Sequence, residues 1–324
     1  MHQSISIILR VLALLAAFTC PIGHAQGDYP SRPLRLIVGF PAGTSPDVVA
    51  RLLAQKLGEE MRQPVVVENF PGAGGLIGAQ TASKAAPDGY TIFMNTVSDM
   101  SIAPHIYSKL PFNPASFEPI SLVMYSDVAL VVPSQNPARN LKEYVEWARK
   151  QQPLFMASLG PGTPAHFGVT TFAKAFSLQA EPVHYKVASD ALTNVATGQV
   201  SGIFGSLALV APFVQDGRMR ALAVSAPTRL PALPNVPTFG ELGYAKFLPD
   251  AWVGIAAPSN TPAPVLDRLS SATQRAMRSP EVVQRLESLG LRSAATTRGE
   301  FAAFLHQDLD QWGKVIKASG FKLE

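Results

Sequence analysis

The chain has 324 residues, of which 47% are hydrophobic and 15% are charged, and its formal net charge is +4. This length suits two domains of ordinary size, and the excess of apolar over charged residues excludes a disordered chain. The weak positive charge, without a concentrated run of Lys or Arg, disfavours nucleic acid as a partner and suits small anionic molecules better.

The N-terminal 25 residues are typical of a secretory signal peptide, since an apolar stretch follows Arg10 and small residues precede a polar start. We expect cleavage after Ala25 and export. The alternative is a membrane anchor or a lipoprotein acylated at Cys20, although Phe18 and Thr19 do not favour lipidation there. Cys20 is the only cysteine. The mature chain is therefore expected to lack a thiol nucleophile, a disulfide and a Cys-rich zinc site.

After Pro30, apolar strand-like runs alternate with helical patterns, which predicts βαβ units, parallel sheets and an α/β fold. Strands are expected at residues 34–38, 65–68, 91–94, 120–124, 128–132, 154–157, 182–185, 201–204, 221–224 and 252–256. Helices are expected at residues 46–61, 74–84, 141–151, 165–177, 189–197, 262–278, 281–289 and 298–318. From Thr261 onward the chain shows helical patterns and no strand candidate. This order predicts two lobes, with the C-terminal segment packing back on the first.

The segment LRLIVGFPAGTSPDVVARLLAQKL joins a buried strand to a helix through a short loop with two glycines. Ser45 is suited to cap this helix, Pro46 occupies the favoured first position, and Asp47 lies near the positive end of the helix dipole. A helix start of this kind directs unpaired backbone N–H groups at whatever lies above the loop. The segment therefore predicts an anion site.

A second glycine-rich element, NFPGAGGLIG, covers residues 69–78. Its glycines permit close approach of the backbone to a ligand, or equally close packing of a helix on a sheet. A dinucleotide fingerprint is disfavoured because Ile77 stands where the third glycine would be needed. We expect no cofactor.

A third element, SLGPGTPAHFG, starts at Ser158 and repeats the strand, loop and helix design in the second half. Ser158 and Thr163 offer hydroxyl donors, and Gly160 exposes backbone N–H groups. His166 is a candidate donor to a carboxylate, although a packing histidine is the default interpretation. Two such loops, one from each half, predict a ligand cleft between them; either loop alone is common in α/β proteins.

The sequence shows no motif of an enzyme or a metal site: it has no G-x-S-x-G elbow, Walker A or H-E-x-x-H, and its histidines are scattered. Four aspartates are candidates for acid–base pairs, although helix caps and solvated surfaces explain them as well. They are Asp47, Asp99, Asp127 and Asp190. We expect no catalytic residue and no metal.

The order of motifs along the chain resembles the tripartite tricarboxylate transporter solute receptors, the Bug or TctC-type family. The segments that carry the resemblance are FPAGTSPDVVAR, NFPGAGGLIGA, APDGYTI, PISLV before VALVVPS, SLGPGTPAHF, VHYKVASDALTNVATGQVSGIFG, RLPALPNVPTFGELGY and WVGIAAPSNTPAPVL. Together they cover nearly the whole chain from about residue 29.

The resemblance implies a two-lobe, type-II-like periplasmic binding protein whose cleft closes on an organic acid and which delivers it to a membrane permease. It implies lobe one at residues 28–126 plus 249–324 and lobe two at 127–248, joined near Ser126 and Pro249. A monomer is expected. The implied ligand contacts are Phe40, Ala42, Gly43, Thr44, Asp47 and Ser98 from the first lobe, and Ser158, Gly160, Thr163, His166 and Gly205 from the second.

Two departures from the family pattern bear on the ligand. Gly205 stands where the family often has an Asp, and Val187 replaces the usual glycine of YKG. Both changes make the second lobe less polar, so we expect a carboxylate with an apolar or aromatic body rather than an amino acid. The alternatives are a secreted enzyme acting on a carboxylate and a partner that reports ligand to a membrane sensor.

Overall fold

The computed structural model describes residues 29–185, 187–244 and 251–323. The chain divides between Ser31 and Arg32, and the described residues before this point, 29–31, carry no helix or strand. The predicted signal peptide with cleavage after Ala25, and the predicted crossing near Pro249, lie outside the described residues. All elements below lie in the part of the chain from Arg32 onward.

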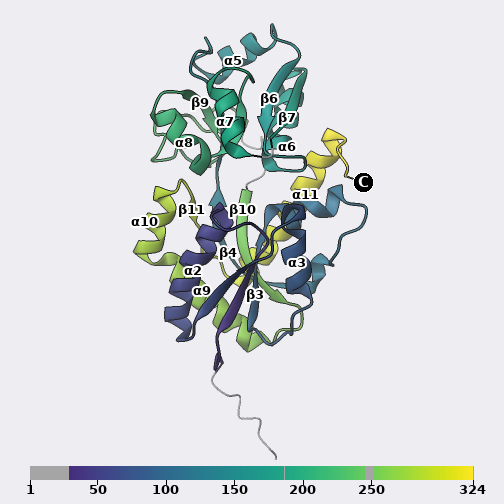
Figure 1. Ribbon diagram of the computed structural model, residues 1–324, viewed down its shortest axis with the longest axis vertical. Helices are drawn as coiled ribbons and strands as arrows, with labels where there is room; N and C mark the ends of the chain where they lie inside the picture. The colour runs from purple at the N-terminus through teal and green to yellow at the C-terminus, as the bar shows by residue number, and fades with distance from the viewer. Residues whose placement is uncertain (1–28, 186, 245–250, 324) are drawn as a thin grey trace, which may run out of the picture. The chain divides into compact units, whose positions relative to one another are not determined.

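One sheet has six strands in the order β11-β4-β10-β3-β1-β2 (Figure 1). Its strands are β1 (Leu34–Val38), β2 (Val65–Asn69), β3 (Thr91–Thr96), β4 (Phe117–Ser126), β10 (Ala251–Pro258) and β11 (Arg292–Ser293). Its helices are α2 (Ser45–Met61), α3 (Leu76–Ser83), α4 (Ala103–Ile106), α9 (Ala263–Arg278), α10 (Pro280–Ser288) and α11 (Arg298–Ser319). Short helical turns occupy Ala73–Gly75, Ser98–Ile102 and Pro114–Ser116. We call this assembly the first lobe.

The other sheet has five strands in the order β7-β6-β8-β5-β9. Its strands are β5 (Val128–Pro133), β6 (Leu154–Ser158), β7 (Ala180–His184), β8 (Ile203–Ser206) and β9 (Met219–Val224). Its helices are α5 (Leu141–Ala148), α6 (Pro164–Phe176), α7 (Ala188–Ala196) and α8 (Leu207–Gln215). We call this assembly the second lobe. The chain enters it between β4 and β5, at Asp127.

The α/β class with two sheets flanked by helices is confirmed, and the predicted parallel pairing is present in only part of each sheet. In the first lobe β1 pairs in parallel with β2 and β3, whereas β10 runs antiparallel to both β3 and β4. In the second lobe β5 is antiparallel to β8 and β9. The reason is topological: β5 and β10 are the strands that follow the passages between sheets, and each enters its sheet in the opposite direction.

The ten predicted strands are all present, and five further elements went unpredicted: α4, α8, β11 and the turns Ser98–Ile102 and Pro114–Ser116. Helix α8 was missed because Pro212 lies inside it and its sequence is apolar on nearly every side. Strand β11 has two residues, too few for an alternating pattern, and it corrects the prediction that no strand follows Thr261. The turn Ser98–Ile102 is a single π-helical turn without a sequence signal.

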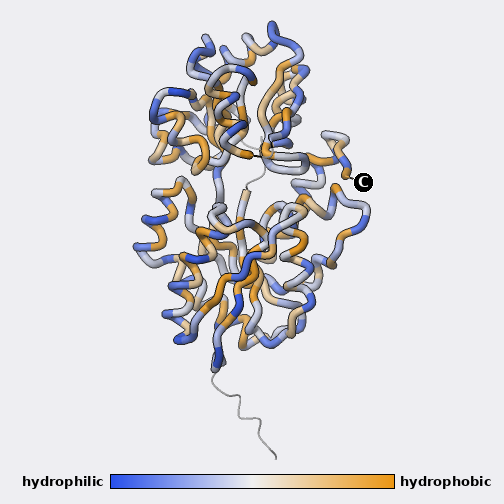
Figure 2. The backbone as a smooth tube through the Cα atoms, in the orientation of Figure 1, coloured by the Kyte–Doolittle hydropathy of each residue, from blue (hydrophilic) through white to orange (hydrophobic). Residues whose placement is uncertain are grey.

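The cores follow the hydrophobic strands, which Figure 2 shows as orange segments inside each lobe. Each face of the second-lobe sheet has its own cluster, one around Tyr144 and Phe172 and the other around Ile203 and Val210. A first-lobe cluster around Trp252 and Trp312 also contains Phe167, which belongs to α6 of the second lobe. The two lobes therefore share part of one core. No helix among the described residues is long and apolar enough to cross a membrane.

Candidate functional site

The first candidate loop, residues 39–44, connects β1 to α2 and is open to solvent at Ala42 and Gly43. Thr44 occupies the N-cap position, rather than the expected Ser45, and its side chain makes no capping hydrogen bond. Its hydroxyl donates instead to the carbonyl oxygen of Pro41 at 2.7 Å. The first turn of α2 therefore receives no acceptor from its own cap. Such a helix start attracts an external anion through its N–H groups and the helix dipole.

The buried side chain of Asp47 supports this loop through hydrogen bonds. Its side chain is 2% exposed, and its carboxylate accepts hydrogen bonds from the Arg51 guanidinium at 3.0 Å, the Gly43 N–H at 2.8 Å and the Asn69 amide at 2.9 Å. The same Asn69 amide nitrogen donates to the carbonyl oxygen of Phe40 at 3.0 Å. Burial alone would raise the pKa of Asp47, but these hydrogen bonds outweigh burial and hold that pKa below its ordinary value.

This network changes the expected roles of two residues. The carboxylate of Asp47 is fully engaged inside the protein, and a second carboxylate beside it would be repelled. The N–H of Gly43 is directed at Asp47. Gly43 also has φ +81°, a conformation that favours glycine, so it allows the loop to turn toward Asp47. Neither residue offers these groups to a ligand; both hold the loop in place.

The second glycine-rich element packs against the first loop. A Cβ on Gly39 would lie 2.7 Å from the carbonyl oxygen of Gly75, and a Cβ on Gly78 would lie 2.6 Å from the Cα of Gly39. These distances are too short for any side chain. A Cβ on Gly75 would also lie 3.3 Å from the ring of Phe40. Close packing therefore accounts for these glycines without a ligand.

The end of β3 places polar groups beside the same loop. Asn95 is fully buried, and both polar atoms of its side chain have no hydrogen-bond partner among the described residues. Ser98 is half-buried at the start of the π-helical turn. The carboxylate of Asp99, also fully buried, accepts hydrogen bonds from the N–H and hydroxyl of Thr96, and a Cβ on Gly75 would lie 3.1 Å from it. Burial raises the pKa of Asp99 to about 7.

The second candidate loop, residues 159–163, connects β6 to α6 and satisfies its own polar groups. Thr163 caps α6 by accepting from the N–H of His166 at 3.3 Å and donates to the carbonyl oxygen of Gly160 at 2.8 Å. The hydroxyl of Ser158, a fully buried residue, donates to the same oxygen at 3.1 Å. The N–H of Gly162 donates to Nδ1 of His166 at 3.0 Å.

His166 is 4% exposed because the C-terminal segment covers it: the ring of Phe321 meets it edge-on at 4.5 Å. His184 approaches its other side at 5.2 Å. Burial, with a smaller contribution from His184, lowers the pKa of His166 to about 4, so its ring is neutral near pH 7. This arrangement agrees with the packing interpretation of His166.

The second loop is also attached to the first lobe. The ring of Phe167 lies 5.5 Å from that of Trp312 in α11, and Phe167 is fully buried. A Cβ on Gly162, whose φ is +74°, would lie 2.8 Å from Cδ1 of Ile106 in α4. The first turn of α6 therefore packs on first-lobe elements that lie on both sides of it. Of the expected contacts, the structure thus brings Ser158, Gly160, Thr163 and His166 together in one self-bonded loop.

Gly205 lies in β8, paired with Ala129 of β5. A Cβ at this position would lie 2.4 Å from Cγ1 of Val210, a fully buried residue of α8. The space that a side chain at 205 would take is therefore filled by an apolar group. Any contact of Gly205 with a ligand would have to use its backbone.

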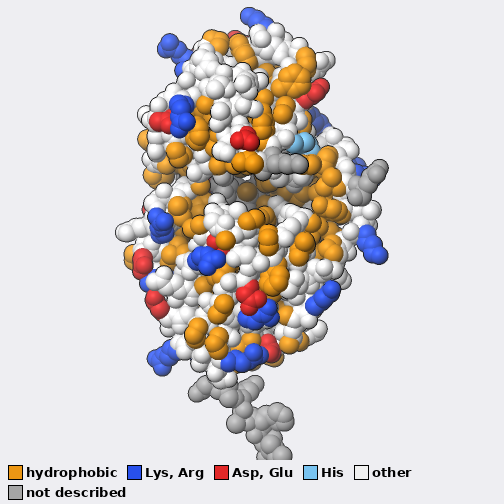
Figure 3. Space-filling view, viewed as in Figure 1, with side chains coloured by type: hydrophobic (Ala, Val, Ile, Leu, Met, Phe, Trp, Pro, Cys, Tyr) orange, Lys and Arg blue, Asp and Glu red, His pale blue; other side chains and the backbone are white. Residues whose placement is uncertain are grey.

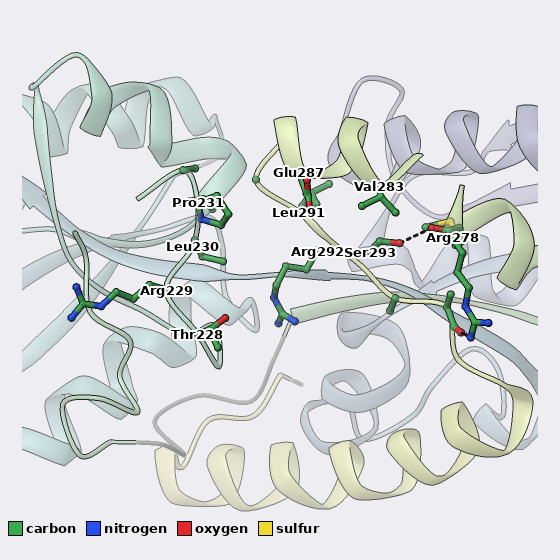
Figure 4. Close-up of a pocket in the computed structure, with 16 residues that line it drawn as sticks. Thr228, Arg229, Leu230, Pro231, Arg278, Val283, Glu287, Leu291, Arg292 and Ser293 are labelled. Carbon is green, nitrogen blue, oxygen red and sulfur yellow. Dashed lines mark hydrogen bonds between the residues drawn. The ribbon is translucent and has the colours of Figure 1, made fainter. Parts of the chain in front are cut away.

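A cavity of about 600 Å³ lies elsewhere between the lobes (Figure 4). The second-lobe arm with Leu230 and Pro231 forms one wall, and α10 and β11 of the first lobe form the other. Arg292 in this wall makes a bidentate ion pair with the buried Asp127, at 2.6 and 2.8 Å. Sequence reasoning missed this pair, because 165 residues separate its partners. The pair stabilises the first crossing between the lobes.

The aspartates considered for acid–base work are accounted for separately. Asp47 pairs with Arg51, Asp99 with Thr96 and Asp127 with Arg292, while Asp190 is exposed on α7. Among the described residues, no group of three or more His, Cys, Asp or Glu side chains is placed to hold a metal ion.

Two α/β lobes, one built on each sheet, define the class of two-lobe solute receptors. The surface is hollowed along the boundary between them (Figure 3). The chain belongs to the tripartite tricarboxylate transporter family receptors, whose TctC family model matches residues 49–321.

The chain matches curated relatives over nearly its full length. It is 33% identical to the UPF0065 protein in the tcbD-tcbE intergenic region of a Pseudomonas species, over 95% of this chain and 93% of the relative. It is 30% identical to Protein BugT of Bordetella pertussis, over 97% of this chain and 99% of the relative.

Solved structures agree. The periplasmic binding protein BugD matches with TM-score 0.77 and 31% identity, over 91% of this chain and 100% of BugD. The R. palustris protein Rpa4515 with adipate matches with TM-score 0.81 and 26% identity, over 91% and 99%. MatC of Rhodopseudomonas palustris with bound malate matches with TM-score 0.76 and 28% identity, over 89% and 100%. The chain is therefore a solute-binding receptor of TctC or Bug type.

Proposed function

We propose that this receptor works in the periplasm, captures a small organic carboxylate by closure of its lobes, and delivers it to a tripartite tricarboxylate-type membrane transporter. The observation that carries the proposal is the open helix start at Thr44, where the cap side chain leaves the first turn of α2 without an acceptor. Such a site binds anions, and a carboxylate is one of them. Two structural neighbours hold dicarboxylates, adipate and malate.

In this proposal the first loop makes the primary contacts, through Phe40, Ala42 and Thr44, with Ser98 beside them. Asp47 and Gly43 position the loop. The contacts predicted for the second lobe require an exchange of hydrogen-bond acceptors. Ser158 and Thr163 now donate to the carbonyl oxygen of Gly160, and a ligand carboxylate would have to replace that oxygen as the acceptor. Closure is favoured when the ligand gains such contacts only in the closed state. The lobe limits at residues 126/127 and 248/249 remain part of the proposal.

We infer a ligand with an apolar or aromatic body. Val187 is 52% exposed, so this departure from the family pattern places an exposed apolar group in the second lobe, and the buried Val210 fills the space that an acidic side chain at 205 would take. Apolar surface of this kind favours burial of hydrocarbon and offers no partner to a ligand ammonium group. An amino acid is therefore disfavoured.

A thermal-shift screen of carboxylic acids tests the function, because a ligand that binds only the folded state raises the melting temperature by mass action. We expect aliphatic and aromatic acids to raise it and their neutral amides to leave it unchanged. Chromatography of each mixture distinguishes a receptor from an enzyme: the acid should be recovered intact. A screen in which no carboxylate raises the melting temperature, or recovery of a product, would contradict the proposal.

A further inference from the structure

A row of lysines follows the line where α6 of the second lobe meets the C-terminal half of α11 of the first. These helices pack against each other (Figure 1). The lysines surround two grooves, of about 300 and 550 Å³. We call this surface the basic seam; it comprises Lys174, Lys314, Lys317 and Lys322. Lys314 lines both grooves, so they form one continuous surface.

The charges of the basic seam are not neutralised. Within the described part of the chain, none of its four ammonium groups has an ion pair or hydrogen bond, whereas Lys56 on α2 pairs with both Glu59 and Glu281. Asp310 is the single carboxylate among the residues that line the two grooves. Among the described residues that line the grooves, four cations outnumber one carboxylate, which favours a positive potential that attracts acidic partners.

A solvated helix surface explains only part of this pattern. Lys317 lies in the last turn of α11, where a cation complements the helix dipole. Lys174 comes from a different helix in the other lobe, and Lys322 lies beyond the end of α11. Neither belongs to the exposed side of α11. The lysines therefore converge from three segments.

The grooves between the lysines have apolar walls. Val315 and Ala318 contribute to the smaller groove, and Ile316 and Phe321 to the larger. Hollows with apolar walls and cationic rims fit a peptide segment that carries both acidic and apolar side chains. A layer of lipid headgroups is flat by comparison and would contact the lysines without filling the hollows.

We propose that the basic seam is a docking surface for an acidic, amphipathic segment of a partner protein. The identification of that partner as the membrane transporter rests on the proposed transport function. The docking surface itself does not. Because the seam is built from α6 and α11, a docked segment contacts both lobes at once. The partner would thereby recognise the arrangement in which α6 lies against α11.

The test uses the full mature protein and a short fluorescein-labelled peptide of alternating glutamate and leucine residues as the probe. The seam variant carries Lys174→Glu, Lys314→Glu and Lys317→Glu. The control variant carries Lys84→Glu, Lys142→Glu and Lys150→Glu, three exposed lysines outside the seam. Both variants change the net charge equally. Fluorescence anisotropy gives the affinity at low and high salt, and the melting temperature checks folding.

We expect the seam variant to bind the peptide at least about tenfold more weakly than the control variant, with affinity falling as salt rises. Equal affinities of the two variants would overturn the proposal, because net charge alone would then explain binding. Binding to phosphatidylglycerol vesicles but not to the peptide would overturn it in favour of a lipid surface. The thermal shift with carboxylic acids is measured on the same samples. Absence of a thermal shift with these acids would contradict the transport function and would not affect the docking result.

Discussion

The two loops that resemble each other in sequence differ in how they use their polar groups. In the first, the cap residue Thr44 makes no capping hydrogen bond and the neighbouring Gly43 is exposed. In the second, Thr163 caps α6, and Ser158 and His166 are buried and bonded within the loop. One loop is ready to receive an external acceptor. The other is already satisfied.

This difference teaches that a shared strand, loop and helix design does not give the two lobes equal roles. The second loop is held against the first lobe by Phe167 and by the contact of Phe321 with His166. In the proposed mechanism the first loop therefore binds the ligand first, and the second loop contributes contacts only after its own hydrogen bonds to Gly160 have been exchanged.

The largest expected effect comes from removing the contact between Phe167 of the second lobe and Trp312 of the first. Phe167→Ala removes a fully buried ring that packs on Trp312, and we expect a loss of about 3–5 kcal/mol in the free energy of unfolding. Urea denaturation measures it. Phe155→Ala, also in the second lobe but 44% exposed, is the control and should change stability little. Similar losses in the two variants would show that Phe167 does not anchor the loop.

The second prediction concerns pH. The pKa of His166 is lowered to about 4 in the folded protein, against about 6.5 in an unfolded chain. The unfolded state therefore binds more protons between these values, so stability falls as pH decreases from about 6.5 to 4 and is unaffected above that window. Differential scanning calorimetry of wild type and His166→Gln checks this. The variant should lose this component of the pH dependence; an unchanged profile would contradict the burial of a neutral ring.

The third prediction concerns the support of the first loop. Asp47→Asn leaves the Gly43 N–H and the Arg51 guanidinium without a charged acceptor, and we expect a loss of about 1–3 kcal/mol in stability together with weaker ligand binding. Asp190→Asn, at an exposed position on α7, is the matched control. Thermal unfolding and calorimetric titration on both variants separate the effects. Normal ligand affinity in Asp47→Asn would mean that the loop does not need this support.

The smallest expected effect gives the sharpest comparison between the loops. Thr44→Val should weaken ligand binding by about 1–2 kcal/mol with little change in stability, since its hydroxyl caps no helix. Thr163→Val should instead cost about 1 kcal/mol of stability, since it removes an N-cap, and should weaken ligand binding less than Thr44→Val does. Binding titrations and melting curves on both variants decide. The same pattern in the two variants would remove the distinction between the loops.

Much of the fold follows from local patterns. The ten predicted strands form because buried apolar runs such as 34–38 and 128–132 have no other stable arrangement. Strand direction was mispredicted, since only long-range topology decides that β10 runs against β3. Helix α8 was hidden by Pro212. Local signals therefore predict the elements better than their order in a sheet.

For the site, the sequence predicted the positions of both loops but not the hydrogen bonds that their polar groups make. The engagement of Asp47 depends on Asn69, and the burial of His166 depends on Phe321, which lies 155 residues further along the chain (321 minus 166). No local pattern carries such information. The side chain that fills the space beside Gly205 likewise belongs to another element, α8.

The most direct test of the central claim is calorimetric titration of the mature protein with matched acids: adipate, an aromatic monocarboxylate, glutamate and aspartate. We predict saturable binding of at least one of the first two and no tight binding of the amino acids. We also predict that Thr44→Val weakens whichever acid binds. Tight binding of glutamate or aspartate with the aliphatic and aromatic acids inert would contradict the claim, as would a Thr44→Val variant that binds the acid unchanged.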